Sequence, residues 1–215
     1  SMEAMVAGQE EERKRIAKDL HDGLGNLLAN VQMQFSTVQN HIHREKTHAY
    51  SEANQLLGEA CGEVRKIAHN MMPGTLTRFG LVSAILDLKN NIEKSKRISV
   101  DVQVYGLKER LEEKVEISLY RIIQELMNNI IKHAQATEVM IQLARQGDEL
   151  NLLVEDNGQG FDLAQAKAKG GLGMQSLQSR VSYVNGTLDI DTAPGKGCSI
   201  VINIPIYQKQ EALAL

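Results

Sequence analysis

The stretch Asp156-Asn157-Gly158-Gln159-Gly160-Phe161 decides the fold of the C-terminal half of this 215-residue chain. It follows an apolar run at 150–155, which predicts a buried strand that ends at a carboxylate. Asp156 at that position can accept a hydrogen bond from the exocyclic amine of adenine, and Gly158 and Gly160 let the backbone turn tightly beside the base. Alone, the motif also fits a plain turn or a calcium-like loop, so its neighbours matter.

Upstream, residues 125–134 read Glu-Leu-Met-Asn-Asn-Ile-Ile-Lys-His-Ala, near the end of a helix predicted over 111–133. Glu125 and Asn129 are four residues apart and therefore share a helix face. An amide oxygen of Asn129 can ligate Mg²⁺ there, and the Glu125 carboxylate can join the metal site, order its water or polarise a nucleophile. Lys132 and His133 lie one turn further on, within reach of phosphate.

Downstream, residues 170–174 read Gly-Gly-Leu-Gly-Met and open a helix predicted over 174–184. Gly171 and Gly173 would cover the phosphates, because the amides of a helix N-terminus favour negative charge. The segment 161–169 between the glycine clusters predicts a mobile lid. The sequence contains no GxxxxGK[ST], no GxGxxG after a strand and no HRD or DFG set, so an ATP site must use these other residues.

The remaining pattern of this half predicts a helix over 81–96 and five strands. The strands are expected at 98–104, 138–143, 150–155, 186–191 and 198–205. Helices and strands that mix without regular alternation are typical of the α+β class, here a two-layer α/β sandwich. We expect this domain to span residues 75–208, with a tail at 209–215.

The N-terminal half predicts an antiparallel helical hairpin over residues 1–74. Apolar residues recur every three or four positions from about Glu10 to His43, and a second helical pattern runs from Ala53 to the stop at Pro73-Gly74. Two helices cannot cover such stripes on both sides. The pattern therefore predicts a homodimer with a four-helix bundle; the alternative is an intramolecular pair packed on the rest of the chain.

Taken together, the three C-terminal segments resemble the Bergerat or GHKL ATP-binding domain shared by histidine kinases, Hsp90-type chaperones, gyrase-like enzymes and mismatch-repair ATPases. The stretch 186–202 resembles the closing hairpin of that domain. Cys198 stands where a threonine is common in the family. A hydroxyl contact to the nucleotide is therefore in question at this position, and Ser199 is an open candidate to replace it.

The segment Arg15-Ile-Ala-Lys-Asp-Leu-His-Asp-Gly-Leu-Gly-Asn26 resembles the phospho-acceptor box of one histidine kinase subfamily. That subfamily has the HisKA_3-type domain, is NarL/DesK-like, and works with helix-turn-helix response regulators. The residues agree with the resemblance. His21 lies at the edge of the apolar stripe, and its neutral imidazole can attack the γ-phosphate of ATP while Asp22 accepts a hydrogen bond from the other ring nitrogen or takes a proton.

The resemblance implies the core of a sensor histidine kinase that uses ATP and Mg²⁺ as cofactors. It would phosphorylate His21 and transfer the phosphoryl group to an aspartate of a cognate response regulator. In the resembling subfamily, an acid four residues before an amide orients water for dephosphorylation of the regulator, a role that falls on Asp22 and Asn26 here. Two alternatives remain: an ATPase of the same superfamily without a phosphohistidine, and a non-catalytic scaffold.

Composition restricts the partners. With 24 basic and 27 acidic residues the net charge is -3, which predicts neither a nucleic-acid partner nor contact of this segment with a membrane. Cys61 and Cys198 are far apart and lack metal-ligand spacing, as expected in a reducing compartment. We therefore expect a cytoplasmic domain, whose full-length protein can be membrane-anchored.

Overall fold

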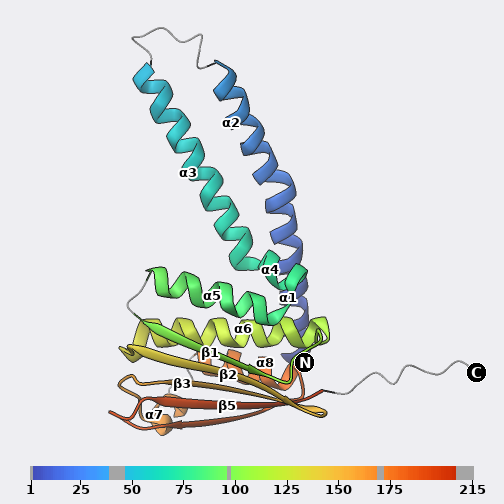
Figure 1. Cartoon of the computed structure of the whole chain (residues 1–215), viewed down its shortest axis with the longest axis vertical. Helices are drawn as coiled ribbons and strands as arrows, with labels where there is room; N and C mark the ends of the chain where they lie inside the picture. The colour runs from blue at the N-terminus through green and yellow to red at the C-terminus, as the bar shows by residue number, and fades with distance from the viewer. Residues whose placement is uncertain (1, 39–46, 96–97, 169–171, 207–215) are drawn as a thin grey trace, which may run out of the picture. The chain divides into compact units, whose positions relative to one another are not determined.

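The computed structural model describes residues 2–38, 47–95, 98–168 and 172–206, and the chain divides into two compact units (Figure 1). One unit comprises Ala7–Thr77, and the other comprises Arg78–Leu215 together with the first six residues. Among the described residues, no helix has both the length and the hydropathy that a membrane span requires.

The helical unit contains a long helix that changes its winding in the middle. Its elements are α1 (Met2–Asp19), the π-helical segment η1 (Leu20–Gly25), α2 (Asn26–Val38) and α3 (Thr47–Met71). Helix α3 contacts both η1 and α2, and the rings of Phe35 and Tyr50 stack at 5.8 Å between centroids. Residues 39–46, which join α2 to α3, lie outside the described residues.

Several large apolar side chains of this unit remain exposed. Their exposed fractions are 60% for Leu27, 61% for Leu56 and 41% for Ile67. Burial of apolar area is the main favourable term in association, so an amphipathic helix with such residues on its surface is incompletely covered. The hairpin of one chain therefore leaves part of its apolar stripes in contact with solvent.

The second unit is an α/β sandwich. Its five strands are β1 (Ser99–Tyr105), β2 (Glu138–Gln146), β3 (Glu149–Asp156), β4 (Thr187–Thr192) and β5 (Cys198–Pro205). They form one sheet in the order β1-β2-β3-β5-β4, in which β1 and β2 are parallel and the other pairs are antiparallel. The α+β class predicted from the sequence is confirmed.

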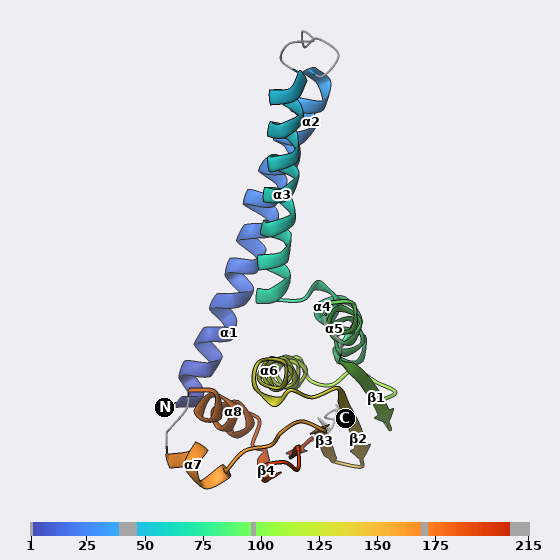
Figure 2. The ribbon, with the colours of Figure 1, turned by 90° about the vertical axis from the view of Figure 1, so that its left-hand side faces the viewer.

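Helices line one face of this sheet, as Figure 2 shows for α5, α6 and α8. The helical elements are α4 (Gly74–Phe79), which spans the boundary between the units, α5 (Leu81–Ser95), α6 (Glu113–Asn129), the π-helical turn η4 (Ile130–Ala134), α7 (Leu163–Ala168) and α8 (Leu172–Tyr183). The alternating residues Leu150, Leu152 and Val154 of β3 are buried beneath them, as a sheet with one covered face requires.

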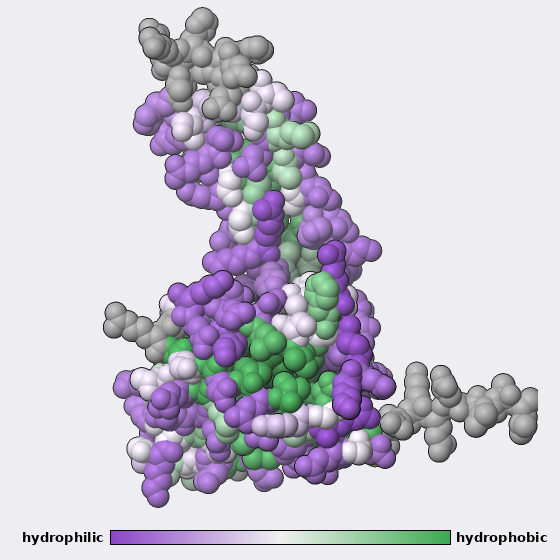
Figure 3. All heavy atoms as spheres, in the orientation of Figure 1, coloured by the Kyte–Doolittle hydropathy of each residue, from purple (hydrophilic) through white to green (hydrophobic). Residues whose placement is uncertain are grey.

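The inward side chains of the edge strand β1 are less buried than those of its neighbour β2. Its inward residues Val102 and Val104 are only half-buried, whereas Ile141 and Leu143 opposite them on β2 are fully buried. Figure 3 shows a patch of hydrophobic residues between α5 and β1, on a surface that is otherwise mainly hydrophilic. A strand with one neighbour receives less cover than a central strand, which accounts for the difference.

Two short helices were not predicted, and one predicted helix needs correction. Helix α4 follows Pro73, and α7 lies within the segment 161–169, where the sequence predicts a lid. The helix predicted from Glu10 begins at Met2 and is interrupted by η1. Short helices of about six residues carry too few apolar positions for a periodic signal, and a π-helical segment departs from the 3.6-residue period on which the prediction rests.

Candidate active site

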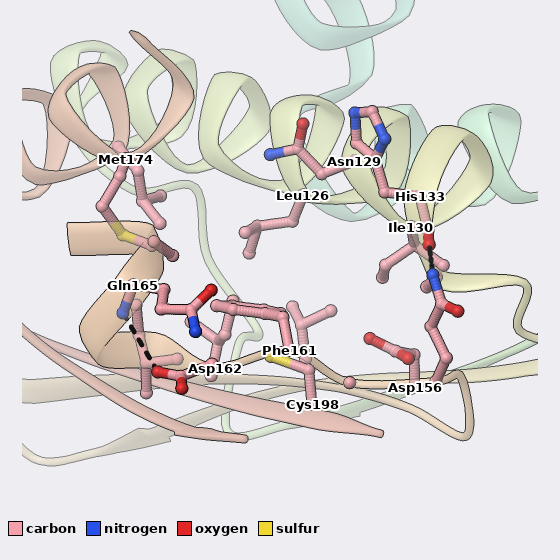
Figure 4. Close-up of a pocket in the computed structure, with 18 residues that line it drawn as sticks. Leu126, Asn129, Ile130, His133, Asp156, Phe161, Asp162, Gln165, Met174 and Cys198 are labelled. Atoms are coloured by element: carbon pink, nitrogen blue, oxygen red, sulfur yellow. Dashed lines mark hydrogen bonds between the residues drawn. The ribbon is translucent and has the colours of Figure 1, made fainter. Parts of the chain in front are cut away.

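A cavity of about 500 Å³ opens between the helices and the sheet of the α/β unit. Figure 4 shows its labelled side chains coming from α6 and η4, the ends of β3 and β5, the segment 161–165 and α8. The walls are mostly apolar, and the polar groups are few. The lining residues with polar side chains are Asn129, His133, Asp156, Gln159, Asp162, Gln165 and Cys198.

Asp156 is the carboxylate on the sheet side of the cavity. It is the last residue of β3, and its Oδ1 accepts a hydrogen bond from the backbone N–H of Gly158 at 2.8 Å. Burial raises the pKa of Asp156, and the hydrogen bond from Gly158 opposes that effect. When ionised, this group is an acceptor suited to the amine edge of a base.

The turn after Asp156 is built by close backbone contacts. A Cβ on Gly158 would collide with the backbone oxygen of Ala134, and one on Gly160, whose φ is +59°, would collide with that of Ala193. The side chains of Asn157 and Gln159 also connect the turn to neighbouring backbone groups by hydrogen bonds. The Asn157 Oδ1 accepts hydrogen bonds from the backbone N–H groups of residues 137 and 138, and the Gln159 Nε2 donates to the His133 oxygen at 2.7 Å.

Asn157 and Gln159 were missed by the sequence analysis. Their position between two glycines of the turn was the available signal, because such turns need side chains that satisfy nearby backbone groups. Gln159 holds the segment 156–160 against η4, the π-helical turn that carries His133 and follows Asn129, and Asn157 holds it against the start of β2. The glycine turn and the helical wall of the cavity are therefore one connected structure.

The helical wall brings some of the predicted residues together and leaves others out. Asn129 and His133 line the cavity. Lys132 is exposed and does not line it. Glu125 does not line it either: its Oε2 accepts a hydrogen bond from the Ser176 hydroxyl at 3.0 Å and lies 3.8 Å from the Arg180 Nε, both on α8.

Cys198 pairs with Asp156 in the register of β5 and β3 and also lines the cavity. Burial, together with the nearby Asp156 charge, raises the pKa of its thiol to about 11. Ser199 does not replace the missing threonine, since its hydroxyl donates to the Glu155 Oε1 at 3.0 Å on the outer face of the sheet. The hydroxyl nearest to Cys198 in the strand register belongs to Thr192.

The remaining wall comes from the segment that follows the glycine turn. Phe161, Asp162, Gln165 and Ala166 line it before the gap in the described residues, and Met174 and Leu177 of α8 line it afterwards. Gly171 lies outside the described residues, and Gly173 belongs to the first turn of α8.

The residues of the cavity fit a magnesium ion that is held mainly by a nucleotide. Within the described part of the chain, no three His, Cys, Asp or Glu side chains gather in a metal-binding group. Asn129 offers one amide oxygen at the cavity. Mg²⁺ keeps several waters and often takes only one or two protein ligands besides phosphate oxygens, so a single amide suits that role.

The second candidate site is His21 in η1 of the helical unit. Its side chain is 73% exposed, and its Nδ1 lies 2.8 Å from Oδ1 of Asp22. A carboxylate only accepts hydrogen bonds, so in a neutral imidazole this contact favours the proton on Nδ1 and the lone pair on Nε2. The Asn26 amide donates to the backbone oxygen of Asp22 at 2.9 Å.

The fold is shared with a solved histidine kinase domain. The histidine kinase domain of the blue-light activated histidine kinase from Erythrobacter litoralis EL346 superposes with a TM-score of 0.51 at 18% identity, over 84% of this chain and 94% of that one. The likeness shows a shared fold: a helical domain joined to an α/β sandwich.

Two family models match the sequence. One, described as "Histidine kinase" (HisKA_3), matches residues 12–76, and the other, described as "Histidine kinase-, DNA gyrase B-, and HSP90-like ATPase", matches residues 114–208. The chain belongs to the sensor histidine kinases that carry these two domains, as the resemblance of both halves predicted.

Curated relatives agree over nearly the whole chain. The "Signal transduction histidine-protein kinase/phosphatase DegS" of Brevibacillus brevis is 32% identical over 96% of this chain and 54% of its own length. The "Sensor histidine kinase LiaS" of Bacillus subtilis (strain 168) is 30% identical over 94% of this chain and 56% of its own length. The chain thus spans about half the length of the curated relatives it matches.

Proposed function

We propose that this chain is the cytoplasmic core of a sensor histidine kinase that phosphorylates His21 with Mg-ATP. One observation carries the proposal: an exposed imidazole, oriented by Asp22 with Nε2 free, occurs in the same chain as a mostly apolar cavity that has a carboxylate at the end of β3. In this proposal residues 1–74 form the dimerisation and phosphotransfer domain, residues 75–208 bind ATP, and 209–215 are a tail.

In this proposal, different residues of the cavity bind different parts of the nucleotide. Asp156 accepts a hydrogen bond from the exocyclic amine of adenine, and the apolar wall packs on the base. Asn129 would ligate Mg²⁺, and His133 would contact the phosphates from the cavity wall. Lys132, which is exposed and lies outside the cavity lining, would have to extend toward the phosphates from the same helical turn. From the sequence, Gly171, which lies outside the described residues, and Gly173 are expected to contribute backbone amides to the phosphates. When bound to Asn129 and the nucleotide, Mg²⁺ would supply positive charge that offsets the negative charge of the phosphates during transfer of the γ-phosphoryl group.

The reaction at His21 uses its Nε2 lone pair. Nε2 attacks the γ-phosphorus, the bond between that phosphorus and the bridging β-γ oxygen breaks, and ADP leaves with the bond electrons. The phosphorylated ring keeps the proton on Nδ1 and is positively charged, so the Asp22 carboxylate 2.8 Å away stabilises it. Asp22 or solvent then removes that proton.

The phosphoryl group next passes to an aspartate carboxylate of a response regulator. The exposure of His21 supports this step, because a second protein must reach Nε2. Asn26 is one turn further along the chain, and its amide is the group proposed to orient water when the regulator is dephosphorylated. The relative named kinase/phosphatase supports that second activity.

The exposed leucines of the hairpin support a homodimer as the working form. Leu27 and Leu56 are each about three-fifths exposed in one chain. A second copy would bury them in a four-helix bundle. Each fully buried leucine contributes roughly 1.5–3 kcal/mol relative to an exposed one, so a few such residues are a strong driving force for association.

The test is incubation with γ-labelled Mg-ATP of the parent chain, His21→Gln and Asn129→Asp. The proposal expects acid-labile, base-stable label on the parent and none on either variant, with His21→Gln still able to bind ATP. ATP hydrolysis by the parent without label would favour an ATPase of the same superfamily. A parent that neither binds nor hydrolyses ATP would favour a non-catalytic scaffold.

A further inference from the structure

Glu125 links α6 and α8, two helices that pack against each other and both contribute side chains to the cavity wall. Its carboxylate accepts a hydrogen bond from the Ser176 hydroxyl at 3.0 Å and lies 3.8 Å from the Arg180 guanidinium. Ser176 and Arg180 are four residues apart, so they present neighbouring side chains on one face of α8. The contact therefore joins α6 to one particular face of α8.

The next residue along each helix faces the cavity. Leu126 follows Glu125 on α6, and Leu177 follows Ser176 on α8; both are buried, and both line the cavity. A slide or rotation of α8 that broke the contact between Glu125 and Ser176 would displace Leu177 by a similar amount. Because cavity walls are closely packed, a shift of this kind changes the space available to a ligand.

We propose that Glu125 is a positioning residue, which holds α8 against α6 through Ser176 and Arg180 and thereby sets the width of the nucleotide cavity between Leu126 and Leu177. The inference rests on the proposed nucleotide site. It gives Glu125 a role different from polarising a nucleophile or ligating the metal.

The charge of Glu125 strengthens the link. A hydroxyl donor on an ionised carboxylate makes a stronger hydrogen bond than one on a neutral acceptor, and the Arg180 cation stabilises the carboxylate in this geometry. Glu125→Gln keeps an acceptor of the same size for Ser176 but removes the attraction to Arg180. Ser176→Ala removes the hydroxyl donor and leaves the carboxylate in place.

The two roles predict opposite kinetics. A positioning residue acts on the cavity, so its loss raises the Kd and KM for ATP while the rate at saturating ATP is retained. A catalytic base acts on the reacting atoms, so its loss lowers the saturating rate at unchanged Kd. Ser176 distinguishes these cases, because it lies on α8 and would matter only to the positioning role.

The experiment measures the calorimetric Kd for Mg-ATP and the KM and kcat of His21 labelling. The full chain is compared with Glu125→Gln, Ser176→Ala, the double variant and Ser176→Thr. The matched control is Ser179→Ala on the same helix, where the hydroxyl donates to the backbone oxygen of Gln175 at 2.7 Å. Thermal unfolding of each variant tests whether it is folded.

We expect Glu125→Gln and Ser176→Ala each to raise Kd and KM about five- to tenfold with kcat within about twofold of the parent. The double variant should be less impaired than the product of the single effects, because both act through one contact. Ser176→Thr, which keeps the hydroxyl, should restore the parent affinity, and Ser179→Ala should equal the parent.

Three results would overturn the inference. One is a lower kcat at unchanged Kd for Glu125→Gln with Ser176→Ala equal to the parent, which would assign catalysis to Glu125. Another is parent-like affinity in every folded variant. A parent chain that does not bind ATP would overturn the proposed function and this inference together, whereas the first two results leave ATP binding by the parent intact.

Discussion

Arg110 holds the carboxylate of Glu116 with two of its nitrogens. The Arg110 Nε lies 2.9 Å from Oε1 and 3.0 Å from Oε2, and its Nη2 lies 2.6 Å from Oε2. The Glu116 side chain is 4% exposed, whereas that of Arg110 is 50% exposed. Gly80, between α4 and α5, lies against the same side chain, because a Cβ there would be 2.7 Å from the Arg110 Cδ.

Removal of this guanidinium is expected to destabilise the α/β unit. In Arg110→Ala the buried Glu116 carboxylate keeps the backbone N–H of Leu111 at 3.2 Å but loses its charged partner. We expect a lower free energy of unfolding than that of the parent, measured by urea denaturation. Arg110→Lys should recover only part of the difference, because lysine cannot form the two-nitrogen contact. Lys108→Ala, in the same loop and exposed, is the control; equal midpoints for the two alanine variants would contradict the prediction.

Gly147 and Gly160 both have a positive φ, but only Gly160 has other backbone atoms close to the position of a Cβ. Gly147 has φ +61° with no atom within 4 Å of a Cβ, whereas Gly160 has φ +59° and its Cβ would collide with the Ala193 oxygen and lie 2.7 Å from that of Gly197. Gly147→Ala is therefore expected to cost only the left-handed penalty, roughly 1–2 kcal/mol.

Gly160→Ala adds the collision to the same penalty. We expect a larger loss of unfolding free energy than in Gly147→Ala, together with a loss of ATP binding, because the backbone must move beside Asp156. Urea denaturation and calorimetric titration of both variants measure the difference. Similar stability and affinity in the two variants would show that the turn has room to adjust.

The strands of the α/β unit could be predicted because their side chains alternate. Leu150, Leu152 and Val154 are buried and alternate with half-buried positions, and the strand expected at 198–205 has those bounds in the structure. The prediction needed only local sequence, because one face of the sheet is covered. The π-helical segments η1 and η4 could not be predicted in this way, since they depart from the helical period.

The cavity residues were predictable where a motif combined a polar side chain with a recognisable backbone conformation, such as a glycine turn or a helix. Asp156, Gly160 and Asn129 belong to such motifs, and all three line the cavity. The partner of Glu125 was not predictable: Ser176 is 51 residues away, and only the packing of α8 on α6 brings the two together. Spacing within a helix fixes which residues share a face, but it does not fix what that face meets.

The raised pKa of Asp156 predicts a pH-dependent affinity for adenine. Base recognition needs the ionised carboxylate, so adenosine affinity should fall as the pH falls through the raised pKa of Asp156, at a higher pH than for an ordinary aspartate. In the absence of ligand, the pH dependence of folding stability has the opposite sign. The folded state holds this proton more tightly than the unfolded chain, so ionisation costs stability as the pH rises from the ordinary pKa through the raised one.

Asp156→Asn is the matched variant for that measurement. Its amide oxygen can still accept a hydrogen bond but does not titrate. The Kd of the variant for adenosine should therefore change less with pH than the Kd of the parent does, between about pH 4 and pH 7. Adenosine avoids the titration of the ATP phosphates. Equal pH profiles for parent and variant in calorimetric titrations would rule out Asp156 as the titrating group.

The half-buried thiol of Cys198 should be unreactive at neutral pH despite lining the cavity. With its pKa raised to about 11, only about 0.1% is thiolate at pH 8, compared with about a quarter of a free cysteine. In a Cys61→Ser background, which leaves a single thiol, alkylation by iodoacetamide should therefore be at least about 100-fold slower than that of a free cysteine. The rate should rise about tenfold for each pH unit, since the thiolate is the reacting form.

Saturating ADP should slow the alkylation of Cys198 further by covering the cavity, and mass spectrometry of the modified peptide measures each rate. Rapid labelling at pH 8 would mean that Cys198 is ionised, and an ADP-insensitive rate would mean that its sulfur is reached from outside the nucleotide cavity.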